Sequence, residues 1–216
     1  MFSQLDNVIF PDSCEVVRCS SQLCVYPIFK NGSSSINESV EENGWEIIRD
    51  YDIESIATPI RVYVRDAHQR FVSGVNTFVQ HNSDLDLKTA LWFVREYPFL
   101  NRHFAPQFFW IINLARYMHP DTKIEIRHMD DIAKITARHS DAGILPASEE
   151  FIREFESLDW NHMRLYHYLD QILTDLVGQT VTYPELVAIV RDQHTSLFEM
   201  VFGKSMNLVE LVRGLP

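Results

Sequence analysis

The chain has 216 residues, of which 46% are hydrophobic, and its 30 acidic and 19 basic side chains give a formal net charge of −11. This composition is typical of a globular protein and excludes a disordered or collagen-like chain. The acidic balance also disfavours a sequence-independent nucleic-acid binder, which needs a cationic face. The length favours one domain, which we expect to span residues 1–216.

The amino-terminal residues and the cysteines favour a cytoplasmic protein. Met1–Phe10 has no basic start followed by an apolar run, so it does not resemble a signal peptide. No stretch approaches the roughly 18 uncharged apolar residues that a membrane span needs. Cys14, Cys19 and Cys24 form neither a CxxC pair nor an even set, so we expect reduced, buried thiols.

Strand and helix patterns alternate along the first part of the sequence. Apolar or alternating runs predict strands at Leu23–Ile28, Trp45–Ile48, Ile60–Val64 and Lys123–Ile126. Helical spacing predicts helices over Ser35–Glu42, Gln69–Val79, Leu85–Glu96, Pro106–Met118 and Asp130–Arg138. Further helices are predicted over Glu149–Phe155, Trp160–Leu176 and Pro184–Phe202. This order predicts an α/β fold with a mostly parallel central sheet flanked by helices and a helical carboxyl-terminal half.

The first motif with chemical meaning lies between the first predicted strand and its helix. It reads Lys30-Asn31-Gly32-Ser33-Ser34-Ser35. Such a loop presents backbone N–H groups, hydroxyls and one full positive charge, which suits a phosphate or sulfate group. It is not the nucleoside-triphosphate loop GxxxxGK[ST], because the lysine precedes the glycine. Taken alone, the motif is equally compatible with a helix start beside a solvated lysine.

The second motif begins where the clearest strand ends. It reads Arg65-Asp66-Ala67-His68-Gln69-Arg70-Phe71-Val72-Ser73 and continues into a predicted helix. Open α/β sheets bind their ligands at the carboxyl ends of strands, where Arg65 would lie. Arg70 and Ser73 follow about one and two helical turns later, on the same edge. Taken alone, this motif is equally compatible with a turn before an ordinary amphipathic helix.

Together the two motifs resemble the sulfotransferase superfamily, whose members use 3'-phosphoadenosine-5'-phosphosulfate (PAPS) as donor and share a P-loop-like fold. The resemblance implies that Lys30, Asn31, Gly32, Ser33, Ser34 and Ser35 hold the 5'-phosphosulfate. It implies that Arg65 and Ser73 hold the 3'-phosphate. Ala67 stands where the family usually has proline after Arg-Asp.

A third stretch is similar to the carbohydrate (Golgi-type) branch of that superfamily. His103-Phe104-Ala105-Pro106 resembles its His-aromatic-x-Pro segment, and the strand running into Met129 resembles its later strand, which usually ends near a glutamate. The acceptor implied is a hydroxyl of a sugar or other alcohol, and the acidic surface favours a neutral one. Because this chain shows no membrane anchor, we expect a bacterial or viral cytoplasmic enzyme rather than a Golgi one.

The implied reaction assigns two catalytic residues. Lys30 would stabilise charge on the bridging oxygen as the sulfuryl group leaves. His103 is the first candidate for the base that takes the acceptor proton, although packing at a helix start explains it equally well; Asp50, Asp52 and Glu54 are the other candidates. No HExxH or similar pattern occurs among the nine histidines, so we expect no metal.

Two other functions remain open from the sequence. A nucleotide-type kinase would also combine an α/β fold with an anion-binding loop, but it would require ATP and magnesium. An inactive sulfotransferase-like domain that serves as a binding module would keep the motifs without the base. Oligomeric state and adenine contacts are not assigned by any pattern in the sequence.

Overall fold

A computed structural model describes residues 16–28, 30–81, 86, 88–89, 103, 105–136, 149–150, 152–153 and 169–202. Its framework is a six-stranded sheet with the strand order β3-β1-β2-β4-β5-β6. The strands are β1 (Val16–Cys19), β2 (Cys24–Tyr26), β3 (Glu46–Arg49), β4 (Ile60–Val64), β5 (Lys123–His128) and β6 (Thr180–Thr182).

The sheet is mixed. β4 pairs in parallel with β2 on one side and with β5 on the other, so parallel pairing forms the centre. β1 pairs antiparallel with both β2 and β3, and β6 pairs antiparallel with β5. The predicted α/β architecture is therefore confirmed. The prediction of a mostly parallel sheet is wrong, because three of the five strand pairings are antiparallel and only the centre is parallel.

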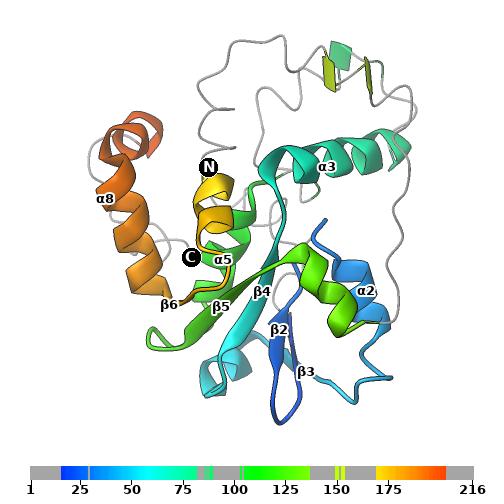
Figure 1. The fold of residues 1–216 in the computed structure, drawn as a ribbon, viewed down its shortest axis with the longest axis vertical. Helices are drawn as coiled ribbons and strands as arrows, with labels where there is room; N and C mark the ends of the chain where they lie inside the picture. Colours follow the sequence, from blue (N-terminus) through cyan, green and yellow to red (C-terminus); the bar gives the residue numbers. More distant parts are fainter. Residues whose placement is uncertain are drawn as a thin grey trace.

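Helices cover both faces of this sheet. The α-helices are α2 (Ser33–Glu38), α3 (Ala67–His81), α5 (Gln107–Ala115) and α8 (Tyr183–Phe202), and the 3-10 helices are η2 (Asp50–Ser55) and η3 (Met129–Lys134). Figure 1 shows α5 and α8 on one side of the sheet and α2 on the other, with α3 running across the top of the view from the end of β4.

The alternation of side chains along each strand produces a separate apolar core on each face. Ile60, Val62 and Val64 of β4 are fully buried in the larger core, with side chains from α5 and α8. Tyr63 points to the other face and packs in a smaller core with Ile36 of α2 and residues of η3. Each central strand is therefore covered on both sides, as parallel strands generally are.

Several predicted helices differ from the structure or fall outside it. The helix expected over Asp130–Arg138 is the shorter 3-10 helix η3. Of the predicted helices at 85–96, 149–155 and 160–176, the structure describes only residues 86, 88–89, 149–150, 152–153 and 169–176. No helix within the described ranges is long and apolar enough to cross a membrane.

Two of the cysteines are joined in a disulfide, so the prediction of reduced thiols is wrong for them. Cys19 ends β1 and Cys24 begins β2, and they are directly paired across this antiparallel hairpin with their Cα atoms 4.1 Å apart. The strand β1 was not predicted from the sequence, so this juxtaposition was not foreseen. Both residues are buried, as expected. Cys14 lies outside the described residues.

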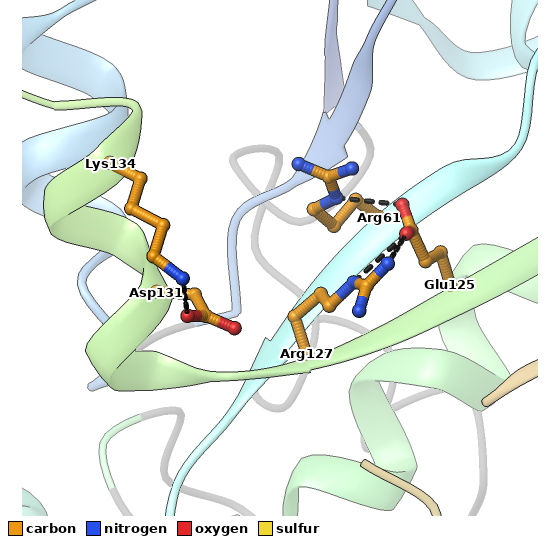
Figure 2. Close-up of polar contacts among 5 residues, drawn as sticks. All are labelled: Arg61, Glu125, Arg127, Asp131 and Lys134. Atoms are coloured by element: carbon orange, nitrogen blue, oxygen red, sulfur yellow. Dashed lines mark hydrogen bonds and ion pairs between the residues drawn. The ribbon is translucent and has the colours of Figure 1, made fainter. Parts of the chain in front are cut away.

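A compact ion-pair cluster lies on the α2 side of the two central strands (Figure 2). Glu125 of β5 accepts hydrogen bonds from Arg61 of β4 at 2.7 Å and from the Nε atom of Arg127 at 2.9 Å. Burial would raise the pKa of Glu125, but the two arginines outweigh it and hold that pKa below its usual range. Both guanidinium groups therefore have a carboxylate partner within the sheet. Arg61 pairs with Glu125 across the two strands and Arg127 pairs with it along β5, so neither forms an open anion site.

Candidate anion-binding site

The two sequence motifs meet at one edge of the sheet. β2 and β4 are neighbouring parallel strands, with Tyr26 level with Val62, so their carboxyl ends lie side by side. Lys30 lies on the loop that follows β2, and Arg65 directly follows β4. Although the two motifs are separated in sequence, the parallel pairing brings them together, at the position where open α/β sheets bind ligands.

The loop after β2 has an unusual backbone. Lys30 has a φ of 66° and Gly32 a φ of 77°, both in the left-handed region, where glycine is far more common than lysine. The amide of Asn31 donates to the carbonyl of Ile28 at 3.1 Å and closes the turn. A Cβ atom on Gly32 would lie only 2.3 Å from the Cδ1 atom of Ile132 on η3. The left-handed φ and this close contact both favour glycine at this position of the loop.

The serines of the motif form the first turn of α2. Ser33 is nearly buried, Ser34 is exposed and Ser35 is half-buried. The amide of Ile36 donates to the carbonyl of Gly32 at 3.1 Å, which is the first hydrogen bond of the helix. The N–H groups before it have no partner within the helix, as at every helix start. Only the hydroxyl of Ser34 belongs to a clearly exposed residue.

In the second motif, Asp66 has a structural role, whereas Arg65 and Ser73 are the candidate site residues. The Oδ1 atom of Asp66 accepts a hydrogen bond from the amide of Gln69 at 2.9 Å, and its carbonyl accepts one from the amide of Arg70, also at 2.9 Å. Asp66 is thus the amino-terminal cap of α3. The cap fixes the direction of the helix relative to the strand. Arg65 and Ser73 are both half-buried, and Ser73 lies one helical turn before Thr77.

Three cations of the two motifs are close enough to influence one another. Burial lowers the pKa of the Lys30 ammonium, and the positive charges of Arg65 and Arg70 lower it further. A partly buried group of positive charges is unfavourable by itself and becomes favourable when an anion is bound among them. This arrangement makes the site a candidate for binding an anion.

The structure adds one residue that sequence reasoning missed. The ammonium of Lys30 donates a hydrogen bond of 2.5 Å to the hydroxyl of Thr77 on α3. Thr77 follows Ser73 by one helical turn, and its hydroxyl also donates to the carbonyl of Ser73 at 3.2 Å. The (i, i+4) spacing in a helix that begins with the second motif is a signal that could have identified this residue.

Asn31 and Gln107 link the two motifs inside the protein. The side chain of Asn31 is fully buried, and its amide donates to the carbonyl of Tyr63 at 2.8 Å and to the Oε1 atom of Gln107 at 2.5 Å. Gln107 also accepts from the amide of Arg65 at 2.8 Å and donates to the carbonyl of Arg65 at 2.7 Å. Since the backbone amide of Asn31 already donates to Ile28, both donor groups of this residue are engaged within the protein.

Arg70 lies within the protein and does not face the crevice where the sequence placed it. It has no exposed surface and donates a hydrogen bond of 2.5 Å to the carbonyl of Ala105. Burial raises the pKa of the Asp170 carboxyl to about 6, against the opposing effects of Arg70, Gln107 and the amide of Phe108. Arg70 and Asp170 thus form a buried polar layer directly beneath the site.

The candidate bases lie in different places. His103 is half-buried, and its ring stacks on that of His81, with the ring centres 5.9 Å apart. Since His81 follows Thr77 by one turn of α3, this places His103 beyond the lysine end of the site. Asp52 and Glu54 are exposed on η2, which contacts β1 and β3. Asp50 begins η2, and its side chain is outside the described part of the structure.

Comparisons with protein-family models, with curated proteins and with solved structures found no match. Within the described ranges, no group of three or more histidine, cysteine, aspartate or glutamate side chains is arranged to hold a metal ion. The interpretation of the site therefore depends on its own geometry and charges.

Proposed function

We propose that this protein is a sulfotransferase that transfers the sulfuryl group of PAPS to the hydroxyl of an acceptor. The observation that carries the proposal is the meeting of Lys30 and Arg65 at the carboxyl ends of adjacent parallel strands, close enough for the arginine charge to lower the pKa of the lysine. A ligand with two separate anionic groups matches two separate cations at one sheet edge. The donor nucleotide, with its 5'-phosphosulfate and 3'-phosphate, is such a ligand.

The proposed reaction breaks the bond between the sulfur and the bridging oxygen of the donor and forms a bond from sulfur to the acceptor oxygen. The products are the sulfated acceptor and 3',5'-adenosine bisphosphate. Lys30 stabilises the negative charge that develops on the bridging oxygen, and its hydrogen bond to Thr77 holds its ammonium in place before the reaction. The acceptor proton passes to a base, for which His103 remains the first candidate.

The acceptor in this proposal is a sugar or another alcohol without strong negative charge. The formal net charge of −11 would repel a polyanionic acceptor at long range, while the donor is attracted by the local cations of the site. Because the reaction needs in-line geometry and charge neutralisation rather than a metal, binding of the donor product is expected to be independent of magnesium.

Calorimetry tests the proposal directly. The protein is titrated with 3',5'-adenosine bisphosphate without metal and, separately, with ATP plus magnesium. We expect binding of the bisphosphate with a Kd of about 1 μM or lower, a free energy of roughly −8 kcal/mol. Lys30→Ala and Arg65→Ala should abolish it, whereas Lys123→Ala should not, because Lys123 is an exposed cation at the start of β5. ATP binding without bisphosphate binding would instead indicate a kinase.

Catalysis needs a separate test, because a binding module would pass the first one. Donor carrying radiolabelled sulfate is incubated with N-acetylglucosamine, galactose or phenol, and labelled product is counted. Transfer should fall by about 10²-fold or more in His103→Ala while bisphosphate binding persists. Unchanged transfer in that variant would move the role of base to Asp50, Asp52 or Glu54. Binding without any transfer to a broader acceptor panel would favour the binding module.

A further inference from the structure

The side chain of Gln107 connects the two halves of the candidate site. It lies at the start of α5, far in sequence from both motifs, and it is fully buried. Its carbonyl oxygen accepts from the side chain of Asn31 at 2.5 Å and from the backbone amide of Arg65 at 2.8 Å. Its NH2 group donates to the carbonyl of Arg65 at 2.7 Å. One amide group thus contacts both motifs.

The two hydrogen bonds between Gln107 and Arg65 resemble the pairing of neighbouring strands. They engage both backbone polar groups of the residue that directly follows β4, where the pairing of that strand ends. On the other side, Asn31 is fixed twice, by Gln107 and by the carbonyl of Tyr63. The side chain of Asn31 and the backbone of Arg65 are therefore held by the same buried group.

Gln107 is itself held by the buried carboxyl group of Asp170. Asp170 lies in the helical residues 169–175, is fully buried and accepts a hydrogen bond from the amide of Phe108 at 3.3 Å. A side-chain hydrogen bond also joins Gln107 to Asp170. Because buried amides with all partners in place have little freedom, this arrangement fixes the Gln107 rotamer.

From these contacts we infer that Gln107 is a positioning residue, which sets the separation between the Lys30 loop and the backbone of Arg65 so that one ligand can engage both. The inference rests on the proposed function in one respect: the two-ended ligand is the donor nucleotide. A ligand held at both ends gains affinity only when the spacing of the two subsites matches its own. Loss of Gln107 should therefore weaken a two-ended ligand much more than a one-ended ligand.

The test compares three nucleotides on wild-type protein and on Gln107→Met, which keeps the side-chain length and removes its hydrogen bonds. The nucleotides are 3',5'-adenosine bisphosphate, which has both phosphates, and 5'-AMP and 3'-AMP, which have one each. We expect bisphosphate affinity to fall about 10-fold or more and each monophosphate affinity to change by less than about threefold. An equal loss for all three, or no loss, would overturn the inference.

The control is Asn113→Leu, which also removes a buried amide of α5 but does so away from both motifs, next to the hydroxyl of Tyr26. It should leave the ratio of bisphosphate to monophosphate affinity unchanged. Where Gln107→Met does not fold, Asn31→Ala removes the loop side of the same link and should show the same selective loss. Combined with Gln107→Met, it should add little, because both variants break one connection; fully additive losses would contradict the inference.

Failure of the proposed function would be recognised separately. If wild-type protein binds none of the three nucleotides, the sulfotransferase proposal fails, and hydrogen exchange then tests the link itself. Gln107→Met should accelerate exchange of the Arg65 amide about 10-fold or more, because that amide loses its acceptor, while the amide of Ile126 in β5 should change little. Unchanged exchange at Arg65 would overturn the positioning role.

Discussion

The ammonium nitrogen of Lys30 lies 2.5 Å from the hydroxyl oxygen of Thr77, although 47 residues separate the two in the sequence. The contact joins the loop of the first motif to the helix of the second. It gives the lysine a fixed direction, which a side chain with several rotatable bonds otherwise lacks. A hydroxyl on α3 therefore contributes to the placement of the proposed catalytic cation.

Thr77→Val tests this contact because valine keeps the shape and removes the hydroxyl. A hydrogen bond to a charged group contributes roughly 1.5–3 kcal/mol, so affinity for 3',5'-adenosine bisphosphate should fall by about 10-fold or more in calorimetry. Thr77→Ser keeps the hydroxyl and should bind within about threefold of wild type. Wild-type affinity in Thr77→Val would show that Lys30 needs no partner on α3.

Gly32→Ala should destabilise the fold for two reasons that can be separated. The new Cβ would lie 2.3 Å from the Cδ1 atom of Ile132, and the φ of 77° is strained for alanine. We expect a loss of about 2–4 kcal/mol in the free energy of unfolding by urea. Gly44→Ala is the matched control, because Gly44 has a φ of 60° and nothing within 4 Å of its Cβ position.

A second substitution isolates the clash at Gly32. Ile132→Val removes the Cδ1 atom that the new Cβ would meet, and it costs roughly 1 kcal/mol by itself. The double variant Gly32→Ala/Ile132→Val should therefore be more stable than the sum of the two single effects, by about 1 kcal/mol or more. Additive effects would mean that backbone strain alone accounts for the requirement for glycine.

Asp170 predicts a specific dependence of stability on pH. Its pKa is raised from 3.8 to about 6 in the folded protein, so between these values the folded state holds a proton that the unfolded state has lost. Its contribution is fully present below about pH 4 and is lost as the pH rises through about 6. The shift corresponds to about 3 kcal/mol.

The effect is isolated by comparison with Asp170→Asn, whose side chain does not titrate. Asparagine keeps an oxygen that can accept the hydrogen bond from the amide of Phe108. Urea unfolding of both proteins is measured from pH 4 to pH 7. Relative to the variant, the wild type should lose about 3 kcal/mol over that range. Parallel stability curves would mean that Asp170 does not titrate there.

The sequence predicted what depends on local pattern. The alternating, β-branched run Ile60–Val64 is β4 with the same limits, and helical spacing located α3, α5 and α8 to within a few residues. The inner strand β1 and the edge strand β6 were missed because polar residues interrupt their few apolar ones: Arg18 in β1, and the two threonines around Val181 in β6. The pairing of Cys19 with Cys24 was missed for the same reason, since it depends on β1.

The positions of some candidate site residues could also be predicted from the sequence, whereas their role stays a prediction. The placement of Lys30 and Arg65 follows from motif position at strand ends, which a sequence shows. The contacts of Gln107 with Asn31 and Arg65 join residues far apart in the chain, and a single polar residue at the start of an apolar helix gives no sign of its partners. For Arg70 the prediction was wrong. Its helical spacing from Arg65 placed it on the ligand-facing edge of the sheet, but the side chain is buried in the interior.

The groups around the site come from distant parts of the chain, from the Lys30 loop to the buried Asp170. No short fragment contains them all, so the proposed anion binding would require the folded chain. A nucleotide that binds the folded chain and not the unfolded chain would stabilise the whole fold. At a concentration one hundred times its Kd, it would raise the free energy of unfolding by about 2.7 kcal/mol. Ligand screening by thermal shift therefore reports on the intact fold, and protection from proteases should extend to the most distant of these segments.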